Sequence, residues 1–300
     1  MVEACFVADR ALITGATGFV GGQLARKLAA EGWEVHSVVR RPPGDPLVRA
    51  LNGIALAHYH DGTMESLTHL VALSRPSVVF HLAARFTADH RPADVELLLR
   101  DNVLFGTQLL EAMRAASAKR IVNAGSAWQH YQNHEYSPVS LYAASKKAFA
   151  DLLLYYVEAH AIHAISLELT DTYGPGDPRR KLIPIMLDAE KAQRALSMVS
   201  GELPLNFVHV SDAVNAFIVA AKRLLADEVA GHEVFAVRSH ETVQVKNLFD
   251  IWQKARNATL TARWGEREYR PREVLDVWTQ GATLPGWEPT VSLTDGLKGL

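Results

Sequence analysis

The stretch Thr14-Gly15-Ala16-Thr17-Gly18-Phe19-Val20-Gly21 decides the fold. It follows a short apolar run, Ala11–Thr14, and opens a segment, Phe19–Ala30, whose apolar residues recur at four-residue steps, as on one face of a helix. Glycines spaced in this way at a strand-to-helix junction are typical of a dinucleotide-binding turn. The first glycine permits the tight turn, the second lets the backbone approach a pyrophosphate, and the third allows the helix to pack closely on the strand.

Further apolar or β-branched runs alternate with helical patterns through the first half of the chain, which predicts a parallel sheet with crossover helices. These runs are Glu34–Val39, Ile54–His58, Val78–Leu82, Arg120–Ala124 and Ala164–Leu169. Helical stripes cover Val95–Ala115 and the stretch from Tyr142 to about His160. We therefore expect an α/β fold, a doubly wound Rossmann sheet over residues 1–170. Residues 171–300 are expected to form mainly a smaller substrate-binding part, with some segments returning to the first domain.

Composition narrows the possible partners. The 300 residues carry a formal charge of −2, so no basic field favours nucleic acid. No stretch approaches the roughly 20 apolar residues of a membrane-spanning helix. The single cysteine, Cys5, cannot pair within the chain, and the sequence does not open with a secretory pattern. These observations predict a cytoplasmic protein that binds neither nucleic acid nor membrane.

Two arginines follow the second predicted strand. Many dinucleotide-binding folds place an Asp or Glu there to bind the ribose 2′-OH of NAD, whereas this chain has Arg40 and Arg41. Guanidinium groups suit a 2′-phosphate, so the pair favours NADP, in the cell NADPH, over NAD. The alternative is a pair of solvated surface arginines.

Tyr142 and Lys146 lie four residues apart on the predicted helix, so both side chains reach one reaction centre. An adjacent ammonium, with the nicotinamide charge, favours the phenolate and lowers the pKa of a tyrosine from its ordinary value near 10. Ser126, at the end of a predicted strand, is placed to bond the same substrate oxygen. A surface Tyr–Lys pair and a loop-capping serine are the simpler alternatives. His130 and His134 lack an identifiable third ligand, so no metal site is predicted.

The order of these motifs resembles that of the extended short-chain dehydrogenase/reductases, the NAD-dependent epimerase/dehydratase family. Further matching segments are Asp61-Gly62, His81-Leu82-Ala83-Ala84, Asp101-Asn102-Val103, Phe207–Ala213 and Pro285–Pro289. The resemblance implies a homodimer and a catalytic set of Ser126, Tyr142 and Lys146. With the two arginines, the expected cofactor-binding residues are Gly15, Thr17, Gly18, Phe19, Val20, Gly21, Arg40, Arg41, Asp61, Gly62, Leu82, Ala83, Ala84, Asn102, Tyr142 and Lys146. From the residues alone, Asp61 reads equally as a helix cap and His81 as a buried structural histidine.

The segments 126–131, 171–177 and 181–184 are similar to the reductases that complete CDP-linked dideoxyhexoses, the CDP-abequose and CDP-paratose synthases. This similarity implies NADPH-dependent reduction of the 4-keto group of a nucleotide-linked, CDP-linked deoxysugar. Asp171 replaces the Asn of the family's Asn-Val-Tyr-Gly-Pro segment, which puts that sugar contact in doubt. The expected substrate-binding residues are Asp171, Arg179, Lys181, Arg270 and Arg272, the cations among them, with Arg180, neutralising a diphosphate. Solvated surface charge is the alternative for these cations.

Three other functions compete with reduction. A nucleotide-sugar 4-epimerase would use the same catalytic residues. A dehydratase is disfavoured, because Ala127-Trp128-Gln129 follows Ser126 where dehydratases of this family carry an Asp-Glu pair. A non-catalytic NADP-sensing protein would keep the fold, but such proteins tend to lack the Tyr and Lys found here.

Overall fold

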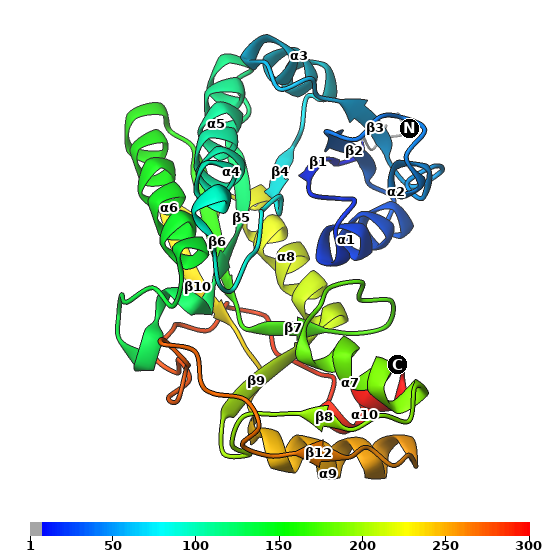
Figure 1. Ribbon diagram of the computed structural model, residues 1–300. Coiled ribbons are helices and arrows are strands. Elements are labelled where there is room, and N and C mark those ends of the chain that lie inside the picture. Colours follow the sequence, from blue (N-terminus) through cyan, green and yellow to red (C-terminus); the bar gives the residue numbers. More distant parts are fainter. Residues whose placement is uncertain (1–7) are drawn as a thin grey trace.

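The computed structural model describes residues 8–300, so Cys5 lies outside the described residues. Its centre is a seven-stranded sheet in the order β3-β2-β1-β4-β5-β6-β10, and every neighbouring pair is parallel (Figure 1). The strands are β1 (Arg10–Thr14), β2 (Glu34–Val39), β3 (Leu56–Tyr59), β4 (Val78–His81), β5 (Arg120–Ser126), β6 (His163–Leu169) and β10 (His232–Val237). This order confirms the doubly wound Rossmann prediction, with the direction of winding reversing between β1 and β4.

Helices cover both faces of this sheet and bury its apolar residues. They are α1 (Phe19–Ala30), α2 (Pro46–Arg49), α3 (Met64–Ser74), α4 (Val95–Leu99), α5 (Phe105–Ala115), α6 (Leu141–His160) and α8 (Val210–Leu225). Leu24 of α1 and Phe217 of α8 share one core with Phe80 of β4. Leu109 of α5 and Phe149 of α6 belong to the core of the opposite face.

The helix expected over Val95–Ala115 is interrupted by a π-helical turn, Arg100–Leu104, between α4 and α5. Asp101 and Asn102 of this turn are buried and bonded to polar partners inside the protein. A π turn widens the helix locally, which lets two successive polar side chains face inward. The stripe of apolar residues alone could not reveal it.

The smaller part carries its own core below the carboxyl ends of the central strands (Figure 1). A three-stranded sheet joins β7 (Asp171–Tyr173), β9 (Pro204–His209) and β11 (Thr242–Gln244), and a two-stranded one joins β8 (Leu196–Ser197) and β12 (Ala262–Arg263). Around them lie α7 (Leu182–Lys191), α9 (Val245–Arg256) and α10 (Leu293–Lys298). None of the described helices combines the length and apolar character needed to cross a membrane.

The second half of the chain also completes the central domain. Helix α8 packs against α1, and β10 adds the last strand beside β6. Asp212 of α8 is buried and accepts hydrogen bonds from the Thr290 hydroxyl at 2.8 Å and the Val291 N–H at 3.0 Å. The indole of Trp287 donates to the Asp212 carbonyl at 2.9 Å, so the C-terminal segment is fastened to α8.

Candidate active site

The glycine turn is shaped by close backbone contacts. Gly15 has a φ of +82°, and a Cβ there would lie 2.7 Å from the Ala83 nitrogen. A Cβ on Gly21 would lie 2.3 Å from the Gly15 oxygen, so α1 packs directly on the turn. Gly18 is the N-cap of α1, and having no side chain it leaves the first N–H groups of the helix open to a ligand. Such a turn fits the phosphates of a dinucleotide.

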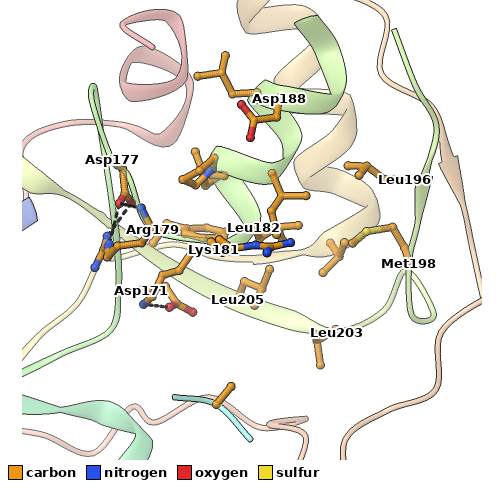
Figure 2. Close-up of a pocket in the computed structure, with 18 of the residues that line it drawn as sticks. Asp171, Asp177, Arg179, Lys181, Leu182, Asp188, Leu196, Met198, Leu203 and Leu205 are labelled. Carbon is orange, nitrogen blue, oxygen red and sulfur yellow. Dashed lines mark hydrogen bonds and ion pairs between the residues drawn. The ribbon is translucent and has the colours of Figure 1, made fainter. Parts of the chain in front are cut away.

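Two cavities adjoin at the carboxyl ends of the strands. The smaller, about 220 Å³, lies between the glycine turn, the ends of β4 and β5, and α6. The larger, about 1290 Å³, lies between the sheet and the smaller part, and Figure 2 shows many of its lining side chains. The residues that line both cavities are Phe86, Trp128, Asp171, Thr172, Arg179 and Lys181. The two spaces therefore meet at one place.

Ser126, Tyr142 and Lys146 all line the smaller cavity. Ser140 caps α6 by accepting from the Ala143 N–H, which sets Tyr142 in the first turn and Lys146 one turn later. Lys146 is only 3% exposed, and burial lowers its pKa to about 8. The fold thus brings to one cavity the three residues that the sequence pattern singles out.

Burial dominates the electrostatics of Tyr142 within the protein. It raises the pKa of the phenol to about 12, and this effect exceeds the opposing effects of the Ser126 hydroxyl and the Arg179 charge. The lowering expected from the Lys146 ammonium together with the nicotinamide charge stays a prediction. At neutral pH the phenol carries its proton and can donate it to a substrate oxygen.

An aromatic wall stands beside Tyr142. The Phe86 ring meets Trp128 edge-on at 5.4 Å between centroids and Tyr142 at 5.0 Å. Sequence reasoning missed Phe86, whose only signal was its place just after the His81–Ala84 segment. These three rings together line one side of the smaller cavity.

Two expected substrate cations lie where the cavities meet, and both are paired. The Lys181 ammonium lies 2.7 Å from the Asp171 carboxylate and 5.3 Å from the centre of the Phe86 ring (Figure 2). Arg179 donates from Nε and Nη2 to Asp177, each bond at 2.7 Å, and its guanidinium lies 4.6 Å from the Phe19 ring. Because Asp171 holds Lys181, the replacement of the family's Asn by Asp creates an ion pair at this point.

The C-terminal arginines separate. Arg270 lines the larger cavity, pairs with Glu273, and lies 5.1 Å from the Trp128 ring. Arg272 is not among the residues that line either cavity; it lies 4.1 Å from the Tyr131 ring and donates to the Ser137 hydroxyl at 2.7 Å. The unexpected Arg194, Arg263 and Arg267 line the larger cavity, as the expected Arg180 does.

Of the remaining cofactor candidates, the Leu82–Ala84 segment adjoins the glycine turn. Leu82 and Ala84 line the smaller cavity, and the Ala83 N–H donates to the Thr14 hydroxyl at 3.2 Å. Thr17 is not among the lining residues. Asp61 accepts from both the N–H and the hydroxyl of Thr63, and Thr63 rather than Asp61 is the N-cap of α3.

The two arginines after β2 diverge. Arg40 Nη1 donates to the buried carboxylate of Asp101 at 2.7 Å, whereas Arg41 Nη1 donates at 2.8 Å to Asp45, the N-cap of α2. The sequence predicts one shared role for the two arginines, but of the two only Arg40 contacts Asp101.

Two buried histidines have structural partners. His81 Nδ1 lies 2.8 Å from the Thr14 hydroxyl, and burial lowers its pKa to about 3, so the ring is neutral. His130 Nε2 lies 2.9 Å from Glu168 Oε2, and its ring stacks on Trp278 at 3.8 Å. Within residues 8–300, no group of three or more His, Cys, Asp or Glu side chains is arranged to hold a metal ion.

Comparison with known sequences places this geometry in context. The profile of the NAD dependent epimerase/dehydratase family matches residues 11–235. The chain is 27% identical over 300 residues to a CDP-abequose synthase of Salmonella muenchen, covering 97% of each chain. It is 26% identical over 310 residues to a UDP-glucose 4-epimerase of Mycolicibacterium smegmatis, covering 96% of each.

Among solved structures, the fold is similar to that of MoeE5 in complex with UDP-glucuronic acid and NAD. The two share 25% identity and a TM-score of 0.77, with 97% of each chain covered. The similarity thus extends over both the central sheet and the smaller part.

Proposed function

The chain belongs to the NAD dependent epimerase/dehydratase family, and on that premise we propose that it uses NADPH to reduce the 4-keto group of a CDP-linked deoxysugar. The motif resemblance found in the sequence is confirmed by the family match and by the full-length similarity to CDP-abequose synthases. The chain is accordingly an NAD(P)-dependent enzyme that acts on nucleotide sugars. The direction of the reaction, the base and the cofactor preference are parts of the proposal.

The position of Tyr142 carries the proposal. Its protonated phenol lines the smaller cavity beside Phe86, which lines both this cavity and the larger, cation-lined one. A sugar ring at that junction would place one carbonyl against the phenol, while its nucleotide extends into the larger space. The lining arginines, Arg194 and Arg267 among them, suit a diphosphate, which needs charged donors.

The residues divide the work of the reduction. The glycine turn would hold NADPH, which would supply a hydride for C4. Tyr142 gives its phenolic proton to O4 as the carbonyl becomes an alcohol, and the Ser126 hydroxyl donates a hydrogen bond to the same oxygen. Lys146, one turn along α6 from Tyr142 and lining the same cavity, would supply a positive charge near the phenolate left after the transfer. Asp171 and Lys181 orient the sugar from the opposite side.

A second candidate within the same class is a nucleotide-sugar 4-epimerase. The similarity to UDP-glucose 4-epimerases favours it, because such an enzyme would use the same phenol and keep its cofactor. Dehydration is disfavoured, because Asp171 is the one acidic residue among those described around the smaller cavity, and it is bound to Lys181. A non-catalytic NADP sensor would have no need of the buried Lys146.

The decisive experiment follows NADPH oxidation with a panel of nucleotide-linked 4-keto sugars that carry different bases. We expect stoichiometric NADPH consumption with at least one CDP-linked member, and the configuration of the product at C4 then defines the face attacked. Interconversion of C4 epimers with retained cofactor, and no reduction across the panel, would replace the reductase by the epimerase.

The cofactor preference rests on Arg40, which follows β2 where NAD-specific folds place an acid. NADPH should bind more tightly than NADH, and Arg40→Asp should reduce or reverse that preference. Equal affinity of the unmodified protein for both cofactors contradicts this part of the proposal.

The family resemblance also implies a homodimer. Apolar side chains lie exposed on neighbouring segments of the surface, namely Leu99, Leu104, Leu154 and Tyr155 on α4, the π turn and α6. Helix α4 contacts α6, so these residues form one surface that a second copy could cover. Light scattering after size exclusion tests this, and a mass of about 33 kDa, that of one chain, would contradict it.

A further inference from the structure

Three arginines converge on one buried carboxylate beyond the carboxyl ends of β2 and β4. Asp101 in the π turn is 3% exposed. Its Oδ1 accepts from Arg40 Nη1 at 2.7 Å and from Arg100 Nε at 3.3 Å, and its Oδ2 accepts from Arg85 Nε at 2.7 Å. Burial alone would raise the pKa of this carboxyl, but the arginines outweigh burial and hold the pKa below its usual value. The carboxylate is charged at neutral pH.

The cluster keeps a large positive excess. Three guanidinium charges and one carboxylate leave a net charge of +2. Each arginine side chain is between 40% and 50% exposed, and among residues 8–300 each gives one side-chain N–H to Asp101 and makes no other side-chain hydrogen bond. A guanidinium has five N–H groups, so most donors of the cluster remain free for an anion.

The cluster flanks the glycine turn. In the sheet order, β1 lies between β2 and β4. Arg40 directly follows β2, and Arg85 follows the Leu82–Ala84 segment after β4. In a doubly wound fold, the adenosine half of a dinucleotide lies at this edge, with its ribose at the end of the second strand.

Asn102 fixes the cluster to the rest of the site. Its Oδ1 accepts from the Arg85 N–H at 2.7 Å, and its Nδ2 donates to the Arg85 carbonyl at 3.0 Å and to the Ser145 hydroxyl at 2.9 Å. Ser145 in turn donates to the Tyr142 carbonyl at 2.7 Å. The backbone of Arg85 is therefore held rigidly, which lowers the cost of presenting its guanidinium to a ligand.

We propose that Arg40, Arg85 and Arg100, gathered by Asp101, form a binding site for a phosphate monoester, the 2′-phosphate of NADP. The inference rests on the proposed cofactor and extends it: the site consists of one arginine from the strand end and two that the sequence pattern did not single out. Asp101 is a positioning residue, which offsets the mutual repulsion of three cations while neutralising only one of their charges.

The test measures equilibrium binding by fluorescence titration and needs no turnover. Arg85→Gln and Arg100→Gln should each weaken NADPH by about tenfold, as expected for loss of a charge-assisted contact, and leave NADH within about twofold. The matched control is Arg114→Gln, which removes the same charge from an exposed arginine of α5 paired with Glu111. It should change neither affinity.

Binding of 2′-AMP and 5′-AMP shows whether the cluster recognises a 2′-phosphate or a 5′-phosphate of adenosine. Both arginine variants should weaken 2′-AMP and spare 5′-AMP, and the loss should shrink as salt is raised. An equal loss for NADH and 5′-AMP would overturn the proposal, because the cluster would then bind the pyrophosphate side. Unchanged NADPH affinity in both variants would also overturn it.

Circular dichroism checks that the variants are folded. Arg85→Lys is a second control, because it keeps the positive charge and should retain most of the preference for NADPH over NADH. Failure of this inference is distinguishable from failure of the proposed reaction. Binding results as expected, without reduction of any 4-keto sugar, would leave the phosphate site standing and reject the reductase. Reduction of a 4-keto sugar by NADPH, with the ratio of NADPH to NADH affinity unchanged in the arginine variants, would support the reductase and reject the phosphate site.

Discussion

Replacing Lys146 by methionine should make the protein more stable while it removes most of the activity. The Lys146 side chain is 3% exposed and lines the smaller cavity, and within residues 8–300 its ammonium has no hydrogen-bond or ion-pair partner. Burying a charge without a partner is costly, and methionine fills a similar volume without the charge. The residue is therefore expected to serve function at the expense of stability.

The magnitude follows from the pKa. Burial lowers the pKa of Lys146 from 10.5 to about 8. A difference of this size between unfolded and folded states corresponds to about 3 kcal/mol. The unfolded chain binds more protons between pH 8 and 10.5, so stability rises with pH across that window. The full penalty is present below pH 8, and at pH 7 Lys146→Met should raise the free energy of unfolding by about 3 kcal/mol.

Urea unfolding at pH 7 and near pH 10 measures this effect. The advantage of Lys146→Met should be large at the lower pH and mostly gone at the higher one. Lys147→Met is the matched control, because this neighbouring lysine is partly exposed and paired with Asp151, and its effect should vary little with pH. A Lys146→Met variant that is less stable at pH 7, or whose advantage is independent of pH, would refute the reasoning.

Three further expectations concern single residues. Tyr142→Phe removes only the proton donor, so turnover measured by NADPH oxidation should fall by about 10² to 10⁴ while cofactor affinity stays unchanged; near-normal turnover would mean that another group donates the proton. His81 has a pKa of about 3 in the folded protein against 6.5 ordinarily, so the unfolded chain binds more protons between these values and stability falls with falling pH. As the pH falls from 6.5 to 4, the free energy of unfolding of the unmodified protein should therefore drop by about 3 kcal/mol more than that of His81→Phe, as measured by urea unfolding. The same pH dependence in both proteins would contradict this. Gly21→Ala would place a methyl group 2.3 Å from the Gly15 oxygen, so thermal unfolding should show a loss of about 2 kcal/mol, whereas an unchanged Tm would mean that the turn can yield.

Much of the site could be predicted because its signals are local. The spacing of Tyr142 and Lys146 determines their common helix face whatever surrounds them, and the glycine spacing identifies a turn that any side chain at Gly15 or Gly21 would obstruct. Short apolar runs in the sequence predict strands β1 to β6. Their limits differ from the prediction by a few residues, as at β3, which begins at Leu56 rather than Ile54.

What the sequence could not supply is the geometry of the side chains in the folded protein. Arg179, Lys181 and Arg270 were expected to neutralise a diphosphate, yet each pairs with an acid only two to ten residues away along the chain, and the sequence does not show which cations keep free donors. Arg85 and Asp101 meet because a loop after β4 returns to the π turn. The effect of burial on the pKa of Tyr142 could not be read from the sequence either, since burial depends on how the whole site packs.

Strand β10 and helix α8 have a consequence for how the chain must fold as it is made. Phe80 of β4, Val122 of β5 and Ile165 of β6 share their core with α8, so a nascent chain that ends near residue 170 would have α1 on this face of the sheet but would leave exposed the apolar residues that α8 covers. At a synthesis rate of about 5–20 residues per second, α8 and β10 appear several seconds after residue 170. Hydrophobic collapse is much faster than this, so the sheet can collapse before α8 is available to pack on it. We therefore expect the emerging N-terminal half to need a chaperone until residue 237 has left the ribosome, and truncation before α8 to yield aggregates rather than a free-standing cofactor domain.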